Sequence, residues 1–541
     1  MEFMDPSTEK ALDFQYILNK INTKTPYGKI YKRNMRAFLP GEEEKLIEEL
    51  NKVESYIPFV KDKQFMKQID HIFGHIKDLR TSIRKANNGG ILSEVELFEI
   101  KNFLYLVKDL YHLLKKQKLP SWSDIKIQPI DKLEKYLDPE DTGLSTFYIY
   151  DSYSEELRKI RQYKREVERE IKREKRYLKK RIEEDLNIKL RPDGTIILPK
   201  DDKKLIEKIE NHPHLAYVSE TYINIKYSIK PTDNMTLLER QYLILKDKEE
   251  REEYRIREEL SKQVGRRSKD LFRNIASIGK IDFILGKAIF AIEINGIKPN
   301  IISDHMIKIV EGRHPKIEEI LKEKGLNFTP ITIELKEGVS CITGPNMGGK
   351  TVSLQLVGLL TAMAQHGLMV PAKEMTLGLN QFIKTSIGDP QSMDKGLSTF
   401  GGEIKLIQEA IERCNERGLI LIDELARGTN PEEGYAISRA IVEYLIDKNC
   451  ITLLTTHYDN IGNIEDVIHF QVVGLSNVDL GKLKLQLQDI EDEIDAINKY
   501  MDYRLKRVDD ETKVPKEAIN IASIMGLNKE IISKSEKYLG Q

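Results

Sequence analysis

Residues 339–351, with the sequence VSCITGPNMGGKT, constrain the fold of this chain more than any other stretch. The first five residues are mainly apolar and predict a buried strand, which a glycine-rich turn separates from Lys350 and Thr351. Gly344, Gly349, Lys350 and Thr351 match the pattern G-x-x-x-x-G-K-[ST]. In such a loop, backbone N–H groups and a helix N-terminus hold phosphate, lysine reaches the β- and γ-phosphates, and threonine ligates Mg²⁺. The stretch therefore predicts a phosphate-binding loop.

The residues that follow this loop support the same interpretation. Apolar residues recur with helical spacing after Val352, at Leu356, Val357, Leu359, Leu360 and Met363. Strand, loop and helix therefore come in the order that a phosphate-binding loop requires. An accidental glycine turn is the alternative, and it does not account for this order.

Two further strands end in polar residues. Four aliphatic residues at 419–422 precede Asp423 and Glu424, which is a Walker B pattern. A buried parallel strand brings Asp423 to a metal at its carboxyl end, where Glu424 can orient or deprotonate the attacking water. The strand predicted at 451–455 leads to His457, which we interpret as a γ-phosphate sensor; a structural histidine is the alternative. Together these patterns predict an ATPase that uses ATP and Mg²⁺.

The composition bounds the remaining possibilities. The chain has 541 residues, of which 32% are charged and 40% hydrophobic, and its formal net charge is -1. This length predicts two to four domains, and the composition is typical of a helix-rich soluble protein. The overall charge indicates neither a nucleic-acid nor a membrane partner, so any basic surface must be local.

Cysteine usage and the N-terminus indicate a cytoplasmic protein. Cys341, Cys414 and Cys450 lie far apart in apolar segments without metal-binding spacing, which predicts buried, reduced thiols. The N-terminal sequence MEFMDPSTEK is not a signal peptide, and nowhere do eighteen apolar residues run together.

The first 300 residues predict helices around a protruding arm. We expect a helical core at 1–150, a charged arm with a small β tip at 151–235, returning helices at 236–297 and an α/β ATPase domain at 298–541. In the arm, a narrow near-heptad seam predicts a long, coiled-coil-like helix. Its apolar positions are Leu157, Ile160, Val167, Ile171 and Leu178. The predicted fold is therefore mainly α-helical with a C-terminal α/β domain.

Basic residues on the arm allow two interpretations. Lys172, Arg173, Lys179 and Lys180, with neighbours such as Lys164, Arg165 and Arg181, are candidate ligands for DNA phosphates through counterion release. Acidic residues are interleaved with them at spacings that suit i,i+4 pairs, so an ordinary solvated helix face fits equally well.

Five motifs resemble those of a known family. GPNMGGKT, EGRHP, STF, DELARGTNPEEG and TTHY are similar to motifs of the ATPase domain of the MutS family of DNA mismatch repair proteins. The stretch SKDLFRNIASIGKIDFILGKAIFA resembles the family's lever and core, and YRLKRVDDETKVPKEAINIASIMGLNKEII resembles its closing segment. The NPEEG sequence is closer to the branch linked to recombination control.

The resemblance implies roles for single residues. Lys350, Glu424 and His457 would be catalytic, Thr351 and Asp423 would hold Mg²⁺, and Phe328 would stack on adenine. Ser398 would reach the nucleotide of the opposite subunit, which implies a homodimer, or a heterodimer with a paralogue, that closes through a C-terminal helical segment. The ATP-binding set would be Phe328, Gly344, Pro345, Asn346, Met347, Gly348, Gly349, Lys350, Thr351 and Ser398. The ATPase domain would be a P-loop domain of the ABC type.

The sequence also departs from the family pattern. No F-x-E triplet occurs, about 300 residues before the ATPase domain leave no room for mismatch-reading domains, and the sequence ends at Gln541 without a nuclease domain. We therefore expect a reduced member of the family. Ala426 stands where the family has glycine, and 475–498 form an acidic insertion.

Three functional hypotheses follow. The first is a dimeric, Mg²⁺-dependent ATPase that clamps double-stranded or branched DNA in mismatch repair or recombination control. The alternative is an ATP-driven remodelling or reactivating factor for a client enzyme, such as an adenosylcobalamin-dependent lysine aminomutase. A dimer that binds ATP without hydrolysing it is disfavoured because Lys350, Thr351, Asp423 and Glu424 are all present.

Overall fold

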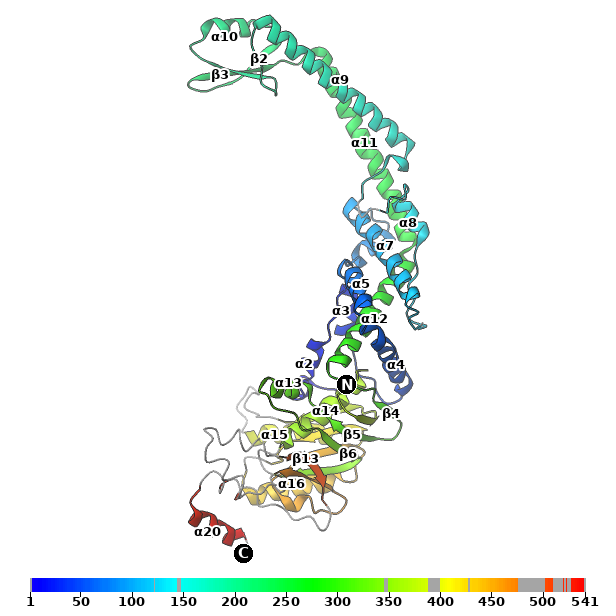
Figure 1. Ribbon diagram of the computed structural model, residues 1–541, viewed down its shortest axis with the longest axis vertical. Helices are drawn as coiled ribbons and strands as arrows, with labels where there is room; N and C mark the ends of the chain where they lie inside the picture. Colours follow the sequence, from blue (N-terminus) through cyan, green and yellow to red (C-terminus); the bar gives the residue numbers. More distant parts are fainter. Residues whose placement is uncertain are drawn as a thin grey trace. The chain divides into compact units, whose positions relative to one another are not determined.

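The structure, a computed structural model, describes residues 2–120, 122–143, 147–344, 349–387, 399–426, 429–474, 502–508, 519, 522 and 527–539. Most of these residues are helical, and the strands form three sheets (Figure 1). This confirms the expected combination of helical and α/β structure. No helix in the described ranges is both long and apolar enough to span a bilayer.

The chain forms two compact units. The first comprises the residues up to 74, 118–125 and those from 277 onward; the second comprises 75–117 and 126–276. The N-terminal helices thus belong to the same unit as the predicted phosphate-binding loop. The limits of the four domains expected from the sequence remain predictions.

The first unit contains a six-stranded sheet in the order β13-β12-β7-β11-β10-β9. Its strands are β7 (Gly338–Thr343), β9 (Phe382–Ser386), β10 (Gly418–Ile422), β11 (Ile451–Thr455), β12 (Ile468–Gly474) and β13 (Asp502–Arg507). All pair in parallel except β13, which is antiparallel to β12. Every residue of β7, β10 and β11 is buried, as expected for central parallel strands. Because β11 separates β7 from β10, the carboxyl ends of these three strands are adjacent.

A second sheet of the same unit has the order β4-β8-β5-β6. It consists of β4 (Asn300–Ile302), β5 (Met306–Gly312), β6 (Ile331–Lys336) and β8 (Glu374–Gly378). Helix α13 (Pro315–Glu323) lies between β5 and β6 in the chain. The unit also contains α15 (Thr399–Ile411) and α16 (Pro431–Leu445), which precede and follow β10.

Helix α14 (Lys350–Gln365) is packed closely by the N-terminal residues. These form α1 (Pro6–Ala11), α2 (Phe14–Lys20), α3 (Pro26–Arg33), α4 (Glu43–Val60) and α5 (Lys63–Gly74). A Cβ atom on Gly358 would lie 2.5 Å from Leu12 Cδ2, so any larger residue at 358 would require Leu12 to shift. Phe38 N donates to Gln365 O at 2.7 Å, which fixes the end of the helix. The N-terminal segment therefore packs against the helix that follows the predicted phosphate-binding loop.

His366 caps this helix and is buried. Its Nδ1 donates to Ala362 O at 2.7 Å, and its ring centroid lies 4.6 Å from that of Phe14. Because burial disfavours the charged imidazolium, the pKa of His366 is lowered to about 4. The native state therefore binds fewer protons than the unfolded state between the ordinary histidine pKa of about 6.5 and a pH of about 4.

We expect His366 to make the fold sensitive to acid. The contribution of neutral His366 to the free energy of unfolding is complete above pH ~6.5 and is lost as the pH falls toward 4. Between pH 6.5 and pH 5 the loss is about 2 kcal/mol. Urea unfolding at pH 7 and pH 5 should show that the parent loses about this much more stability than His366→Gln. Equal losses in the two proteins would contradict the assignment.

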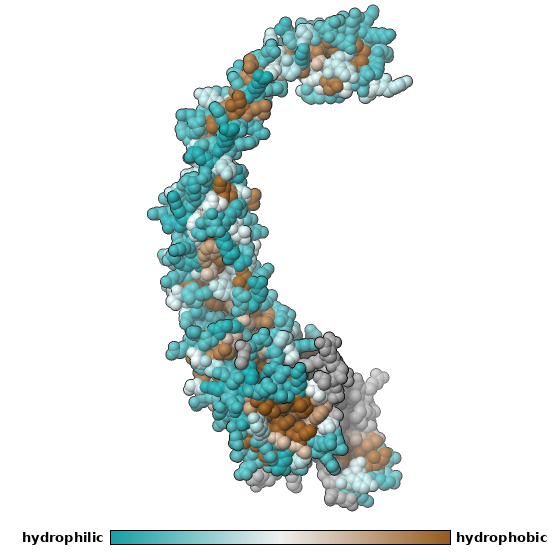
Figure 2. All heavy atoms as spheres, turned by 180° about the vertical axis from the view of Figure 1, so that it is seen from behind, coloured by the Kyte–Doolittle hydropathy of each residue, from teal (hydrophilic) through white to brown (hydrophobic). Residues whose placement is uncertain are grey.

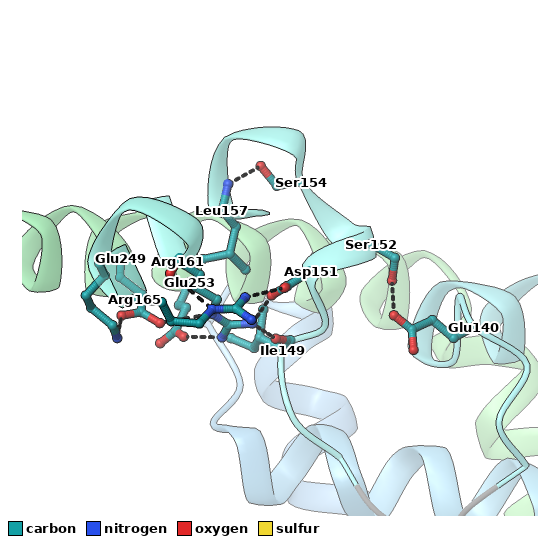
Figure 3. Close-up of polar contacts among 11 residues, drawn as sticks. Glu140, Ile149, Asp151, Ser152, Ser154, Leu157, Arg161, Arg165, Glu249 and Glu253 are labelled. Atoms are coloured by element: carbon teal, nitrogen blue, oxygen red, sulfur yellow. Dashed lines mark hydrogen bonds and ion pairs between the residues drawn. The ribbon is translucent and has the colours of Figure 1, made fainter. Parts of the chain in front are cut away.

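The second unit contains a hairpin of two long helices, α9 (Glu155–Leu186) and α11 (Asp233–Arg266). Its other helices are α6 (Arg80–Asn87), α7 (Glu94–Lys116), α8 (Asp131–Leu137) and the 3-10 turn η1 (Asp151–Tyr153), and α12 (Ser268–Glu293) contains residues of both units. Arg161 pairs with Asp151, Glu249 and Glu253 at 2.6, 2.9 and 2.7 Å (Figure 3). These contacts join one end of α9 to α11.

Beyond the hairpin, the chain forms a small β tip. Strands β1 (Thr195–Pro199), β3 (Asn224–Ile229) and β2 (Leu215–Glu220) pair antiparallel in that order, with α10 (Lys203–Glu210) beside them. Leu198, Ile209 and Tyr227 share its core. The sequence pattern indicated β1 and β3, but the charged helix α10 and the exposed β2 gave no comparable signal.

The candidate DNA-binding residues of α9 engage acids and backbone on their own unit. Lys172 pairs with Glu168 at 2.7 Å, and Lys180 pairs with Glu184 at 3.6 Å. Lys179 Nζ donates to Arg191 O at 3.0 Å, and Arg173 is exposed. Figure 2 shows a largely hydrophilic surface with separate hydrophobic patches along this unit. These contacts match the solvated-face interpretation.

Candidate nucleotide-binding site

Glycines define both described ends of the loop between β7 and α14. Gly344 and Gly349 have φ angles of 136° and 77°, in the region that favours glycine. A Cβ atom on Gly349 would also lie 3.1 Å from Tyr503 Cδ1. Four predicted ligands between them, Pro345, Asn346, Met347 and Gly348, lie outside the described residues. The chain thus enters α14 through a backbone geometry that permits close approach of a ligand.

Lys350 begins α14, and its side chain turns back over the loop. The residue is 4% exposed, and Nζ donates to Gly344 O at 2.5 Å. A carbonyl oxygen is a weaker acceptor for an ammonium group than a charged phosphate oxygen. The first backbone N–H groups of α14 point out of the helix N-terminus, which is the arrangement that binds anions. Lys350 is therefore in position to exchange its backbone acceptor for phosphate.

Asp423 lies between two threonine hydroxyls at the carboxyl ends of the strands. Thr351 Oγ1 donates to Asp423 Oδ2 at 2.8 Å, and Thr455 Oγ1 donates to Asp423 Oδ1 at 2.7 Å. Mg²⁺ prefers oxygen ligands and commonly takes one or two protein ligands together with waters and substrate phosphates. The Thr351 hydroxyl and the Asp423 carboxylate fit that requirement. In the described ranges, no group of three or more His, Cys, Asp or Glu side chains is arranged to hold a metal.

Glu424 and His457 form a pair beside Thr351 and Asp423. His457 Nε2 lies 2.8 Å from Glu424 Oε1, and Glu424 N donates to Thr455 Oγ1 at 2.8 Å. Glu424 has a φ angle of 52°, which is unfavourable for a residue with a side chain. Such conformations persist where surrounding contacts impose them, and they concentrate at functional sites. The arrangement holds a carboxylate and an imidazole at the edge where the phosphates would lie.

The structure thus brings Lys350, Thr351, Asp423, Glu424 and His457 to one end of the sheet. Phe328 lies in the segment between α13 and β6 and is partly buried. Its stacking on adenine remains a prediction. Ser398 and the 475–498 insertion lie outside the described residues, so their predicted positions are untested.

Two residues at this site were missed by the sequence analysis. Thr455 contacts both Asp423 and the amide of Glu424, but in the sequence it reads only as the last residue of an apolar strand. Tyr503, on β13, packs against Gly349, and burial raises the pKa of its phenol. The position of Thr455 at the carboxyl end of a strand could have indicated its contact with Asp423, but only if the order of the strands in the sheet had been known.

We expect Thr455→Val to impair ATP hydrolysis. The change removes one of the two hydroxyl contacts to Asp423 and leaves the Glu424 amide without its hydroxyl acceptor, at a cost of about 1–3 kcal/mol. Steady-state kinetics should show kcat/KM for ATP reduced by roughly 10- to 100-fold. Thr455→Ser keeps the hydroxyl and should remain within about threefold of the parent; an equally impaired serine variant would contradict the role of the hydroxyl.

Comparison with known proteins gives a consistent family. A family model described as MutS domain V matches residues 340–541. A protein named Endonuclease MutS2 from Shouchella clausii is 32% identical over 401 residues, covering 72% of this chain and 49% of the relative. Proteins of the same name are 28% identical in Caldanaerobacter subterraneus and 30% identical in Ruminiclostridium cellulolyticum, over 100% and 99% of this chain. The chain spans 65% of each of these two relatives.

Proposed function

Because the chain belongs to the MutS family, we propose that it is a Mg²⁺-dependent ATPase of the MutS type. One observation carries the proposal: Asp423 accepts hydrogen bonds from the threonine that follows Lys350 and from Thr455, and Glu424 follows it directly. A hydroxyl and a carboxylate for the metal, a lysine for the phosphates and a second carboxylate for water are thereby assembled within one unit.

Each of these side chains has a distinct role in the proposed reaction. Lys350 moves from Gly344 O to the β- and γ-phosphates, while the α14 amides bind phosphate oxygens. Mg²⁺, held by Thr351 and Asp423, would neutralise charge on the β- and γ-phosphates. Glu424 orients a water and accepts its proton as the water oxygen bonds to the γ-phosphorus and the bond to the ADP oxygen breaks. His457 contacts Glu424, and its proposed role is to sense the γ-phosphate.

The nucleotide base and the second subunit complete the proposed site. Tyr503, which packs against Gly349, and Phe328 are the aromatic candidates for contact with adenine. Ser398, just before α15, is proposed to contact the nucleotide bound by the other subunit of a homodimer or of a heterodimer with a paralogue. The roles of Phe328 and Ser398 follow from the resemblance of their motifs to those of the family.

We further propose that ATP turnover serves a dimeric clamp on double-stranded or branched DNA, in mismatch repair or recombination control. The relatives' name, Endonuclease MutS2, supports a nucleic-acid substrate for the family. A second candidate is an ATP-driven remodelling factor for a client enzyme, which is compatible with the ion pairs that Lys172 and Lys180 make with acids of their own helix. In that case, basic residues of α9 serve only its solvated surface.

Charge reversal on α9 decides between these candidates. On the DNA hypothesis, changing Lys172, Arg173, Lys179 and Lys180 to Glu should abolish most DNA binding and flatten its salt dependence. For each phosphate that the protein neutralises, the logarithm of the DNA-binding constant falls by nearly one unit per tenfold increase in salt concentration. Basal ATPase activity should persist, because the phosphate-binding loop belongs to the other compact unit.

The measurement is the affinity for a four-way junction, a mismatch and plain duplex near physiological ionic strength, with ATPase assays alongside. Reversing the exposed residues Lys10, Lys61, Lys63 and Lys67 provides a control with the same change in net charge. Equally weak binding of all three DNAs by the parent, without any effect on ATP turnover, would contradict the clamp and favour a protein client.

A further inference from the structure

The loop that leaves β10 has an unusual backbone. Both Glu424 and Ala426 have positive φ angles, 52° and 63°, although neither is glycine. This conformation is unfavourable for a residue with a Cβ atom, because the Cβ atom comes too close to the following carbonyl oxygen. Two such residues within three positions require contacts that hold the loop in place. Because Glu424 is the proposed partner of the attacking water, these contacts set the position of its carboxylate.

Three neighbouring elements contact the backbone of successive residues of the loop. Thr455 of β11 accepts from Glu424 N, and its carbonyl lies 3.4 Å from Leu425 N. Ser438 of α16 donates to Leu425 O at 3.2 Å. The amide of Ala426, at the second strained position, donates to Glu403 Oε1 at 2.8 Å. The loop is thus fixed by β11, α16 and α15.

Glu403 differs from the other two partners because it is a buried carboxylate. It is 6% exposed and lies in the first half of α15. Loss of this acceptor would leave the buried N–H of Ala426 without the hydrogen bond that Glu403 provides. Ile407 and Ala410, further along α15, belong to the same apolar cluster as Ile422 and Leu425. Helix α15 and the loop therefore pack against each other in one apolar cluster.

We propose that Glu403 is a positioning residue for the carboxylate of Glu424. By accepting a hydrogen bond from Ala426 N, Glu403 holds the second strained position of the loop, and the loop in turn keeps Glu424 in its unfavourable conformation. This inference rests on the proposed ATPase function and identifies a positioning contact within its site.

Glu403→Ala and Glu403→Gln separate this role from general stabilisation. Glutamine retains a carbonyl oxygen that accepts from Ala426 N, whereas alanine has no acceptor. We expect Glu403→Ala to reduce kcat for ATP by roughly 10- to 100-fold with KM within about twofold, and Glu403→Gln to restore most of kcat. A glutamine variant as slow as alanine, or a rise in KM that accounts for the loss, would overturn the proposal.

Amide exchange provides a readout that does not require ATPase activity. Hydrogen exchange at Ala426, measured on intact protein, should be at least tenfold faster in Glu403→Ala than in the parent and near the parent rate in Glu403→Gln. Unchanged exchange in the alanine variant would overturn the proposal even if turnover falls. If the parent hydrolyses no ATP but exchange at Ala426 responds as expected, the proposed ATPase function fails while the contact that holds the loop stands.

Discussion

Glu424→Gln is expected to retain ATP binding and to slow hydrolysis by on the order of a hundredfold or more. Glutamine has nearly the same shape as glutamate and can still contact His457, which lies 2.8 Å from Glu424 Oε1 in the parent. An amide, however, cannot accept the proton of the attacking water and orients that water less well. The loss should therefore fall on the chemical step rather than on nucleotide affinity.

Single-turnover hydrolysis with protein in excess, together with equilibrium ATP binding, separates these two effects. Glu433→Gln is the matched control, because it removes the same charge from a position outside the site. Glu433 is an exposed glutamate in the first turn of α16. Unchanged single-turnover rates in Glu424→Gln would remove Glu424 from the catalytic role.

Gly349→Ala is expected to weaken ATP binding by about a hundredfold, which corresponds to about 3 kcal/mol. Two costs combine at this position. Alanine is strained at a φ angle of 77°, and its Cβ would lie 3.1 Å from the ring of Tyr503. Relief of either cost shifts the loop backbone, whose amides must align with phosphate oxygens.

Gly325→Ala is the matched control for backbone strain. Gly325 has a similar φ angle of 71°, but a Cβ there has no neighbour within 4 Å. Titration with a fluorescent ATP analogue should show near-parent affinity for Gly325→Ala, and thermal unfolding should show similar small losses in both variants. Equal ATP affinity in the parent and Gly349→Ala would contradict the assignment of this loop as a phosphate cradle.

Local patterns in the sequence were sufficient to predict the elements that carry the candidate site. Apolar runs ending at Thr343, Ile422 and Thr455 are strands, and α14 begins at Lys350 as expected. These predictions succeed because burial of a central parallel strand and the opening of a helix leave signals within a few residues. The spacing of Lys172 and Glu168 likewise anticipated an i,i+4 ion pair, which forms.

Contacts between distant segments could not be predicted in the same way. The position of β11 between β7 and β10 places Thr455 beside Asp423, but nothing within either strand specifies its neighbours. Leu12 is an apolar residue, but the sequence around it does not indicate that it packs on Gly358. Similarly, the charges of α9 do not reveal that Arg161 gathers three acids, one from the turn before α9 and two from α11.

Magnesium dependence of ATP turnover tests the central claim most directly. The purified chain, the Glu424→Gln variant and the Glu433→Gln control should be assayed for phosphate release with Mg²⁺ and with an excess of chelator. We predict that the parent and the control hydrolyse ATP at similar rates and only when Mg²⁺ is present. Glu424→Gln should hydrolyse ATP about a hundredfold more slowly. Turnover that survives chelation, or that is the same in all three proteins, would contradict the claim that Thr351, Asp423 and Glu424 form an ATPase site.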